Sequence, residues 1–579
     1  MSAREGPWFG GAVVGIVAVL VSTSLPPVYA QEVGLEARVD QLFAQWDRPD
    51  RPGCAVSVLR DGRAVYARGY GSANLEYDIP ITPTSVFHVA SISKQFTAMA
   101  VALLVAEGRV SWDDDIRRYV SEVPGFDAPI TLRQLAHHTS GLRDQWSLLR
   151  MAGWRWEEDV VRQADVLDLT SRQRALNFES GSAFLYSNTG YTLLAVVVER
   201  VSGQSLREFA AERIFGPLEM TATAFHDDHT AIVRNRAYAY VLGDDDAYHI
   251  SIPDFDTVGA TSLFTTVEDL ARWDRNFYTG EVGGRLVLDD LHRPGTLNDG
   301  RIISYAVGLT HGIYRGHATV GHGGADAGYR AEFLRFPDQQ LSFAVLCNLA
   351  SSDPGRLIRA VADIYLESAT SVAGGTPAPW SGSAALADGA AGPGGVGPAV
   401  SPQGEGQLEA LTGLYRRDES DAPLQLVVRN GVLRILSGGG AASDFVPVGP
   451  DRFRLAGSSA EGVFDRTAGA DGSLLLRLSG AAGGDFTQEP RWRPSTEELT
   501  RFVGSYYSDE LGVQYALSVD AGRLIMRQRR LGALALLPTY PDGFFTSGFY
   551  LAFTHGADDT VDGFTISTAR AWKVRFDRQ

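Results

Sequence analysis

The sequence contains little cysteine and has no excess of positive charge. Each of these features excludes certain classes of protein or partner. Only two of its 579 residues are cysteine, so a disulfide-dense scaffold and a cysteine-based metal site are excluded. The chain carries 69 acidic and 52 basic side chains, and its formal charge of −17 argues against nucleic acid as a partner. No glycine-rich phosphate loop or dinucleotide fingerprint stands between a strand and a helix, so no cofactor is expected.

The two cysteines, Cys54 and Cys347, both lie in apolar, strand-like runs. Two buried free thiols are at least as consistent with these runs as one disulfide bond. The sequence alone does not show whether the two strands are neighbours, and a bridge requires that they are. Both states of the cysteines therefore remain open.

The first 30 residues have the pattern of an export signal. Arg4 precedes an apolar stretch over 8–21, and Val28-Tyr29-Ala30 resembles a small-residue cleavage site. A transmembrane anchor is the weaker alternative, because the apolar run is short and is interrupted by glycine. We therefore expect a signal peptide over 1–30, cleavage after Ala30, a secreted or periplasmic protein, and no stable membrane anchor after cleavage.

Residues 31–368 read as one α+β domain. Two β-rich runs, 53–59 and 64–71, are joined by Asp61-Gly62, which is a hairpin signal. Strands at both ends of the domain with helices between them predict an antiparallel sheet with a helical insert. The periodicity predicts helices at 93–108, 131–137, 189–201 and 355–367, and strands at 317–320, 330–336 and 341–348.

Residues 369–407 consist mainly of Gly, Ala, Pro and Ser, which predicts a flexible linker. Beyond it, short motifs recur 91 residues apart, as in Gly413-Leu414-Tyr415 and Gly504-Ser505-Tyr506. A constant offset at four separated positions indicates a tandem duplication, over 408–494 and 495–579. Each copy alternates short apolar runs with Gly/Asp turns, so we expect two small all-β antiparallel, lipocalin-like barrels or sandwiches.

Three short motifs carry candidate chemistry, and the first is Ser91-Ile92-Ser93-Lys94 at the start of the helix expected over 93–108. Residues three apart lie on one helix face, so the Lys94 amine can reach the Ser91 hydroxyl. A serine needs a nearby base, and a lysine serves if burial lowers its pKa. By itself Ser-x-x-Lys is weak evidence, because most occurrences are surface helix residues.

The other two motifs are Tyr186-Ser187-Asn188 and Gly321-His322-Gly323-Gly324-Ala325. A tyrosine phenol near a lysine can carry a proton, and an asparagine amide both donates and accepts hydrogen bonds. Glycines let a backbone approach a substrate, and a strand-edge N–H can bind an oxyanion. Taken singly, each motif is better explained as structure, the first as a helix N-cap and the second as a hairpin connection.

In this order, Ser-x-x-Lys, Tyr-x-Asn and a basic residue before glycine resemble the penicillin-recognising serine hydrolases. Segments 87–90, 135–142, 215–220 and 266–270 fit the same family, and the resemblance covers about 35–368. It implies a three-layer α/β/α β-lactamase-like catalytic domain. It also implies an acyl-enzyme on Ser91, with Lys94 and Tyr186 sharing the proton of its hydroxyl.

The resemblance further implies roles for the remaining motif residues. The backbone N–H groups of Ser91 and Ala325 would hold the oxyanion, and Gly324 would let the strand approach the substrate. Asn188 would orient the substrate amide and contact Lys94. Tyr186 or His322 would return the proton to the leaving group.

Two departures from the family pattern bear on the substrate. His322 stands where lysine is usual, and a neutral histidine anchors a carboxylate less firmly than a lysine cation does. The sequence therefore resembles the D-aminopeptidases of this family more closely, because these pair a His-x-Gly motif with two small barrel domains. Thr261-Ser262 replaces glycines usual before Leu263, which changes the local shape of the pocket.

The expected function is hydrolysis of a small peptide, amide or ester, with D-amino-acid compounds as the favoured class. The sequence does not indicate an oligomeric state. A β-lactamase or D,D-carboxypeptidase is the alternative enzyme, and a penicillin-binding sensor that does not turn over is the alternative of another class. Residues 225–229 contain two histidines and two aspartates, but no further ligand cluster surrounds them, so a solvated loop is expected and no metal.

Overall fold

The computed structural model describes residues 27–155, 158–370, 405–436, 442–456, 460–466, 473–479 and 483–579. Most of the predicted signal peptide and most of the predicted linker lie outside these ranges. Among the described residues, none of the helices combines the length and apolar character that a membrane crossing requires.

The central sheet of the N-terminal domain joins the two ends of that domain, as the sequence predicted. Its six strands stand in the order β10-β11-β12-β13-β1-β2, and all pairs are antiparallel. The hairpin between β1 and β2 is confirmed, and its turn residues Asp61 and Gly62 both have positive φ, as a tight two-residue hairpin turn requires. The strands are β1 (Cys54–Arg60), β2 (Arg63–Tyr70), β10 (Thr310–Tyr314), β11 (His317–Asp326), β12 (Tyr329–Phe336) and β13 (Leu341–Cys347).

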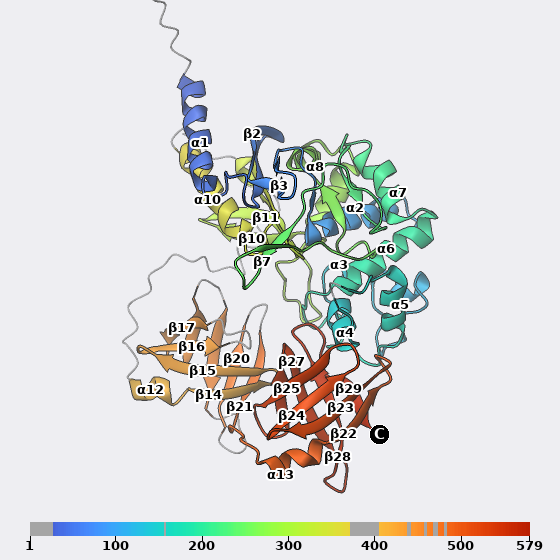
Figure 1. The fold of residues 1–579 in the computed structure, drawn as a ribbon. Coiled ribbons are helices and arrows are strands. Elements are labelled where there is room, and N and C mark those ends of the chain that lie inside the picture. Colours follow the sequence, from blue (N-terminus) through green and yellow to red (C-terminus); the bar gives the residue numbers. More distant parts are fainter. Residues whose placement is uncertain are drawn as a thin grey trace, which may run out of the picture.

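Helices cover both faces of this sheet, because β1 buries alternate side chains on opposite sides. Val56 and Val58 pack in a core with α1 (Pro27–Phe43) and α10 (Pro354–Thr370). Ala55 and Leu59 belong to a larger core that includes α2, α6 and α8. The predicted three-layer α/β/α arrangement is confirmed (Figure 1).

The helical insert and its short strands lie between β2 and β10. The helices are α2 (Ser93–Ala106), α3 (Leu132–Ala136), α4 (Gln145–Met151), α5 (Gln163–Ser171), α6 (Asn188–Ser202), α7 (Leu206–Ala210), α8 (Val267–Thr279) and α9 (Gly284–Leu291). The 3₁₀ turns of the insert are η1 (Ala90–Ile92) and η2 (Ile116–Arg118), and η3 (Ala211–Phe215) is a π-helical turn. A further 3₁₀ turn, η4 (Pro337–Gln339), lies outside the insert, between β12 and β13. The short strands are β3 (Ser72–Asn74), β4 (Ile79–Pro80), β5 (Phe87–His88), β6 (Ala224–Phe225), β7 (Tyr240–Leu242), β8 (Tyr248–Ile250) and β9 (Leu263–Thr265).

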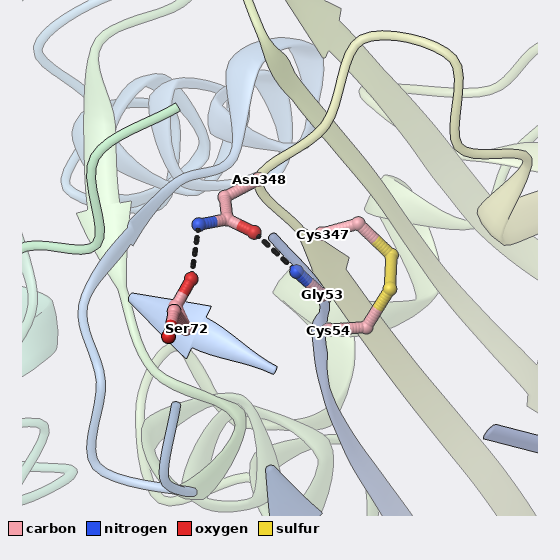
Figure 2. Close-up of a disulfide and its surroundings, with 5 residues drawn as sticks. All are labelled: Gly53, Cys54, Ser72, Cys347 and Asn348. Atoms are coloured by element: carbon pink, nitrogen blue, oxygen red, sulfur yellow. Dashed lines mark hydrogen bonds between the residues drawn. A yellow bond between two sulfur atoms is a disulfide. The ribbon is translucent and has the colours of Figure 1, made fainter. Parts of the chain in front are cut away.

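The two cysteines form a disulfide bond between β1 and β13, which resolves the choice left open by the sequence (Figure 2). Cys54 and Cys347 are direct partners across the antiparallel pair, although 293 residues separate them in the chain. The side chain of Asn348 beside the bridge accepts a hydrogen bond from the Gly53 amide and donates one to the Ser72 carbonyl. The bridge therefore fastens the two ends of the N-terminal domain to each other.

The C-terminal region forms two closed eight-stranded antiparallel barrels, β14 to β21 (barrel 1) and β22 to β29 (barrel 2). The duplication extends to single hydrogen bonds, since the Tyr415 hydroxyl donates to the Leu411 carbonyl and Tyr506 donates to Phe502, each at 2.9 Å. Barrel 1 comprises α12 (Glu405–Glu409), β14 (Gly413–Arg417), β15 (Pro423–Arg429), β16 (Val432–Leu436), β17 (Ala442–Gly449), β18 (Arg452–Leu455), β19 (Glu461–Asp465), β20 (Leu475–Leu478) and β21 (Gly484–Glu489). Barrel 2 comprises α13 (Thr496–Leu499), η5 (Thr500–Phe502), β22 (Gly504–Ser508), β23 (Val513–Asp520), β24 (Arg523–Gln528), β25 (Gly532–Pro538), β26 (Gly543–Thr546), β27 (Phe549–His555), β28 (Val561–Ser567) and β29 (Val574–Arg578).

Barrel 2 is docked on the helical insert through a shared apolar core. In Figure 1 it lies under α4 and α5, and Leu148 and Leu149 of α4 pack in one cluster with the interior of the barrel. The Tyr515 hydroxyl of β23 donates a hydrogen bond of 2.6 Å to the Met151 carbonyl. Arg143 and Glu510 form an ion pair across the same boundary, with side chains only 3% and 5% exposed.

Replacing Glu510 with glutamine should loosen the docking of barrel 2. The Arg143 cation would then be buried without its counter-charge, which costs about 3 kcal/mol. Hydrogen exchange measured by mass spectrometry should show faster exchange in α4 and β23. The double variant Arg143→Met, Glu510→Met removes both charges and should exchange more slowly than Glu510→Gln, but faster than the wild type, because the Trp572 carbonyl loses its donor. Exchange in Glu510→Gln equal to that of the wild type would contradict this role.

Candidate active site

Ser91 lies in the 3₁₀ turn η1, immediately before α2, and is half-buried. The preceding residue, Ala90, has φ of +46°, a left-handed conformation that non-glycine residues rarely adopt. Such strain persists only where the surrounding structure holds it, and it is common at reactive centres. Lys94, one helical turn further on, is fully buried, with its amine nitrogen 3.1 Å from the Ser91 hydroxyl oxygen.

The Lys94 amine is surrounded by two further oxygens and two aromatic rings. It donates to the Asn188 side-chain oxygen at 2.9 Å and to the Ala260 carbonyl at 2.7 Å. It lies 4.8 Å from the centre of the Tyr186 ring. Burial lowers the pKa of Lys94 well below its usual value, and the opposing attraction of Asp144 is smaller. The environment therefore favours the uncharged amine, which is the form that accepts a proton.

Tyr186-Ser187-Asn188 forms the entrance to α6, and Asn188 is the first residue of that helix rather than its N-cap. Asp144 fixes the orientation of Asn188, because one carboxylate oxygen accepts from both its backbone and its side-chain amide at 2.8 Å. The Asn188 side-chain oxygen must then face Lys94. The His138 ring accepts a hydrogen bond from the Ser187 amide, which fixes the turn between Tyr186 and α6.

The Tyr186 hydroxyl is buried and makes no hydrogen bond of good geometry within the described part of the chain. Burial raises the pKa of Tyr186, while the adjacent Ser91 hydroxyl and the Arg570 cation act in the opposite direction. Tyr186 is therefore a neutral phenol near neutral pH. An unpartnered buried hydroxyl beside Ser91 is suited to a hydrogen bond with a bound substrate.

His322 lies within β11, which continues through the glycine-rich run to Asp326 and is longer than the strand predicted at 317–320. Both His322 ring nitrogens are engaged: Nδ1 donates to the Gly323 carbonyl at 2.6 Å, and Nε2 lies 2.9 Å from the Tyr305 hydroxyl. Burial lowers the pKa of His322 to about 4, and Lys94 adds to this effect. The imidazole is therefore neutral at pH 7 and offers no positive charge to a carboxylate.

Gly324 permits β11 to approach the nucleophile. A Cβ atom at Gly324 would lie 2.2 Å from the Val89 carbonyl oxygen, so no larger residue fits beside the strained turn at Ala90. The next residue, Ala325, is exposed towards a cavity of about 720 Å³. Lys94 lies beneath this cavity, which is lined by the other predicted site residues, Ser91, Tyr186, Asn188, His322, Gly324 and Ala325.

The unusual pair Thr261-Ser262 keeps a glycine-like backbone. Ser262 has φ of +75°, and its hydroxyl donates to the Thr257 carbonyl at 2.6 Å, which compensates part of the strain. The Thr261 hydroxyl donates to the Asp326 carboxylate at 3.1 Å. The two hydroxyls therefore fix the loop that glycines would otherwise shape.

Four residues of the site were missed by the sequence reasoning: Asp144, Tyr305, Glu332 and Arg570. Asp144 orients Asn188, and the Tyr305 hydroxyl is the hydrogen-bond partner of the His322 ring nitrogen Nε2. Neither Asp144 nor Tyr305 belongs to a recognisable sequence motif. Glu332 faces the cavity from β12, beside Gly323. Arg570 reaches the same cavity from barrel 2. The scarcity of lysine could have strengthened the assignment of Lys94 to the site, since Lys94 and Lys573 are the only two lysines among the 52 basic residues.

Replacing Glu332 with glutamine should stabilise the protein at pH 8 but not at pH 4.5. Burial raises the pKa of Glu332 from its usual 4.5 to about 7, with Asp353 adding and Arg359 opposing. Between these values the folded protein binds more protons than the unfolded chain, so wild-type stability falls as pH rises to about 7. The glutamine variant escapes this loss, of roughly 2 kcal/mol. Thermal unfolding across pH measures the difference, and a pH-independent difference would contradict it.

Asp228, His229 and Asp256 bring three potential metal ligands within 4.8 Å of one another outside this cavity. Their polar atoms already serve one another and the loop, because Asp256 accepts from both the backbone and the ring of His229. Asp228 accepts from the Thr230 amide and hydroxyl. Asp256 is thus a third potential ligand beside the 225–229 loop that the sequence did not reveal, and its hydrogen bonds with His229 hold it there.

Comparison of the sequence with known proteins found related chains. A family model described as Beta-lactamase matches residues 39–366. D-aminopeptidase of Cereibacter sphaeroides is 28% identical over 302 residues, which cover 52% of this chain and 57% of that protein. Penicillin-binding protein 4* of Bacillus subtilis is 30% identical over 309 residues, covering 51% of this chain and 67% of that protein. The match thus spans little more than half the length of the D-aminopeptidase.

Two solved structures share the fold. The crystal structure of SurE superposes with a TM-score of 0.55 at 21% identity, covering 80% of this chain and 99% of that one. The octameric penicillin-binding protein homologue from Pyrococcus abyssi gives a TM-score of 0.51 at 21% identity, covering 79% and 99%. At this identity the likeness concerns the fold alone.

Proposed function

The chain belongs to the beta-lactamase family, and on this basis we propose that it is an exported serine hydrolase that cleaves amide or ester bonds through an acyl-enzyme on Ser91. D-amino-acid peptides, amides and related esters are the favoured substrates. The disulfide between Cys54 and Cys347 supports the exported location, because such bonds persist in oxidising compartments.

The arrangement of hydrogen bonds around Lys94 carries the proposal. Asn188 Oδ1 and the Ala260 carbonyl can only accept, so both must receive a hydrogen from the Lys94 amine. A neutral amine has two hydrogens and one lone pair. With both hydrogens committed, the lone pair faces the third neighbour, the Ser91 hydroxyl at 3.1 Å. Lys94 is thereby placed to take the proton from Ser91 as its oxygen attacks a carbonyl.

The remaining groups of the site stabilise the negative charge and transfer the proton that this attack produces. The backbone N–H groups of Ser91 and Ala325 bind the oxyanion, and one such donor lowers the barrier by about 3 kcal/mol. Tyr186, whose free hydroxyl lies beside Ser91, gives its proton to the leaving group and recovers one from the protonated Lys94, and it then assists the attack of water. Asn188 orients the amide of the substrate. His322 contributes to the shape of the cavity, because both of its ring nitrogens already have hydrogen-bond partners.

The substrate class follows from the relatives and from the charges near β11. The curated relatives include several D-aminopeptidases. The neutral His322 provides no cation on β11 for a penicillin carboxylate, and the neighbouring side chain beside Gly323 is the Glu332 carboxyl, which provides none either. We therefore favour D-aminoacyl compounds over β-lactams.

A substrate panel on the purified full chain tests this choice. Matched D- and L-alanine 4-nitroanilides, 4-nitrophenyl esters and a chromogenic cephalosporin are compared by kcat/KM. We expect the D-anilide to exceed the L-anilide at least about tenfold, which corresponds to 1.4 kcal/mol of discrimination. Cephalosporin hydrolysis faster than that of the D-anilide would favour a β-lactamase instead.

A further inference from the structure

Barrel 2 contributes the loop between β28 and β29, residues 568–573, to the rim of the active-site cavity. The Arg570 carbonyl accepts hydrogen bonds from the Asp144 amide at 3.1 Å and from the Asn177 side chain at 3.0 Å. The Trp572 amide donates to Asn177 at 2.8 Å, and Arg143 donates to the Trp572 carbonyl at 3.0 Å. The backbone of the loop is therefore fixed to the catalytic domain without using the Arg570 side chain.

The Arg570 guanidinium lies in the cavity beside the reacting groups. Its central carbon is 4.9 Å from the centre of the Tyr186 ring, and the side chain lines the same cavity as Ser91. Within the described ranges, the guanidinium makes no salt bridge and no hydrogen bond, although the residue is exposed. Stacking on Tyr186 holds it in place while its N–H donors stay available.

The other charged groups that line the cavity do not compete for this role. Arg330 donates through Nη1 to the carbonyls of Ala327 and Tyr329, which holds its guanidinium against the turn between β11 and β12. Asp326, Glu332 and Asp353 carry carboxyl groups, which provide no positive charge for an anion. Since His322 is neutral, Arg570 is the cation among the described lining residues whose guanidinium donors all stay without a hydrogen-bond partner.

We propose that Arg570 binds a carboxylate of the substrate close to the scissile bond, so that barrel 2 supplies a specificity-determining residue to the active site. The proposal rests on the proposed Ser91 chemistry and narrows its substrates. A guanidinium pairs with a carboxylate through two parallel hydrogen bonds. The carboxylate can belong to the leaving group, as in a peptide with a free C-terminus, or to the acyl part.

Two substrate pairs that differ only in a carboxylate test the proposal and distinguish these sources. D-alanyl-D-alanine against its C-terminal amide places the charge on the leaving group. Mono-4-nitrophenyl succinate against 4-nitrophenyl butyrate places it on the acyl part. For each pair, the ratio of kcat/KM is measured on the full chain for the wild type, Arg570→Gln and Arg570→Lys.

Lys573→Gln is the matched control, because it removes one cation from the same loop. The Lys573 amine binds the Asp418 carbonyl in barrel 1, away from the cavity. Arg570→Gln should lower the charged-to-neutral ratio by about 10- to 100-fold for one of the pairs, as expected for loss of a charge-assisted contact. Arg570→Lys should lose less, and Lys573→Gln should keep the wild-type ratio.

Three results would overturn the proposal: unchanged ratios in Arg570→Gln, an equal loss on both members of each pair, or the same loss in Lys573→Gln. A wild type inactive on all four substrates would overturn the proposed function instead. Thermal unfolding confirms that each variant is folded, and the backbone anchoring of the loop predicts that Arg570→Gln unfolds like the wild type.

Discussion

Replacing Ser91 with alanine should lower kcat for hydrolysis of 4-nitrophenyl butyrate or a D-aminoacyl anilide at least about 10⁴-fold. The hydroxyl oxygen is the only atom of the motif placed to form the acyl bond, 3.1 Å from the Lys94 amine. Without it, the oxyanion donors and the cavity bind substrate but have no nucleophile to assist. The affinity for substrate should change little, since the side chain is small and half-buried.

The matched control for this variant is Ser171→Ala. Ser171 lies on α5, is exposed, and donates only to the Asp168 carbonyl. It should retain wild-type kcat, and both variants should unfold like the wild type. If Ser91→Ala hydrolyses the ester at a rate within tenfold of the wild type, Ser91 is not the nucleophile.

Replacing Lys94 with methionine should lower kcat/KM at least about 10³-fold, because Ser91 then has no base. Methionine has a similar length but neither a lone pair of comparable basicity nor donors for Asn188 and the Ala260 carbonyl. In the wild type, kcat/KM should rise with pH through the lowered pKa of Lys94, since only the neutral amine accepts a proton. That limb of the pH profile should vanish in the variant.

Lys573→Met controls for the loss of a lysine, because it removes the only other lysine of the chain. Its amine binds carbonyl and carboxylate oxygens of barrel 1, and it should keep the wild-type pH profile. Near-ultraviolet circular dichroism checks that the aromatic cluster around Lys94 is intact in both variants. A Lys94→Met enzyme within tenfold of wild-type kcat/KM would show that another group activates Ser91.

The fold could be predicted where short-range patterns decide it. The Asp61-Gly62 turn specifies the hairpin of β1 and β2, and the repeated glycines and tyrosines reveal the two barrels before any contact is known. The extension of β11 through Gly321, Gly323 and Gly324 could not be predicted in this way. Those glycines suggest a turn, and the reason they are tolerated in a strand is the approach of the Val89 backbone at Gly324.

The candidate site could be predicted where its residues stand in motifs, and not where they meet through the fold. The order of the motifs resembles a family pattern, which is why their residues could be expected to meet. The cavity is indeed lined by Ser91, Tyr186, Asn188 and His322. The Cys54–Cys347 bridge requires that β1 and β13 are neighbouring strands, and the sequence alone did not establish this. The position of Arg570 in the cavity depends on the docking of barrel 2 on α4. The sequences of these two segments contain no pattern that predicts this contact.

The acyl-enzyme itself is the most direct test of the central role of Ser91. The purified protein is mixed with a slowly hydrolysed 4-nitrophenyl ester, quenched in acid at successive times, and weighed intact by mass spectrometry. We expect an adduct of the acyl mass that forms first and then decays, and peptide mapping should locate it on Ser91. A persistent adduct would indicate a sensor rather than a hydrolase. Turnover with no adduct, or with the adduct on another residue, would contradict the account.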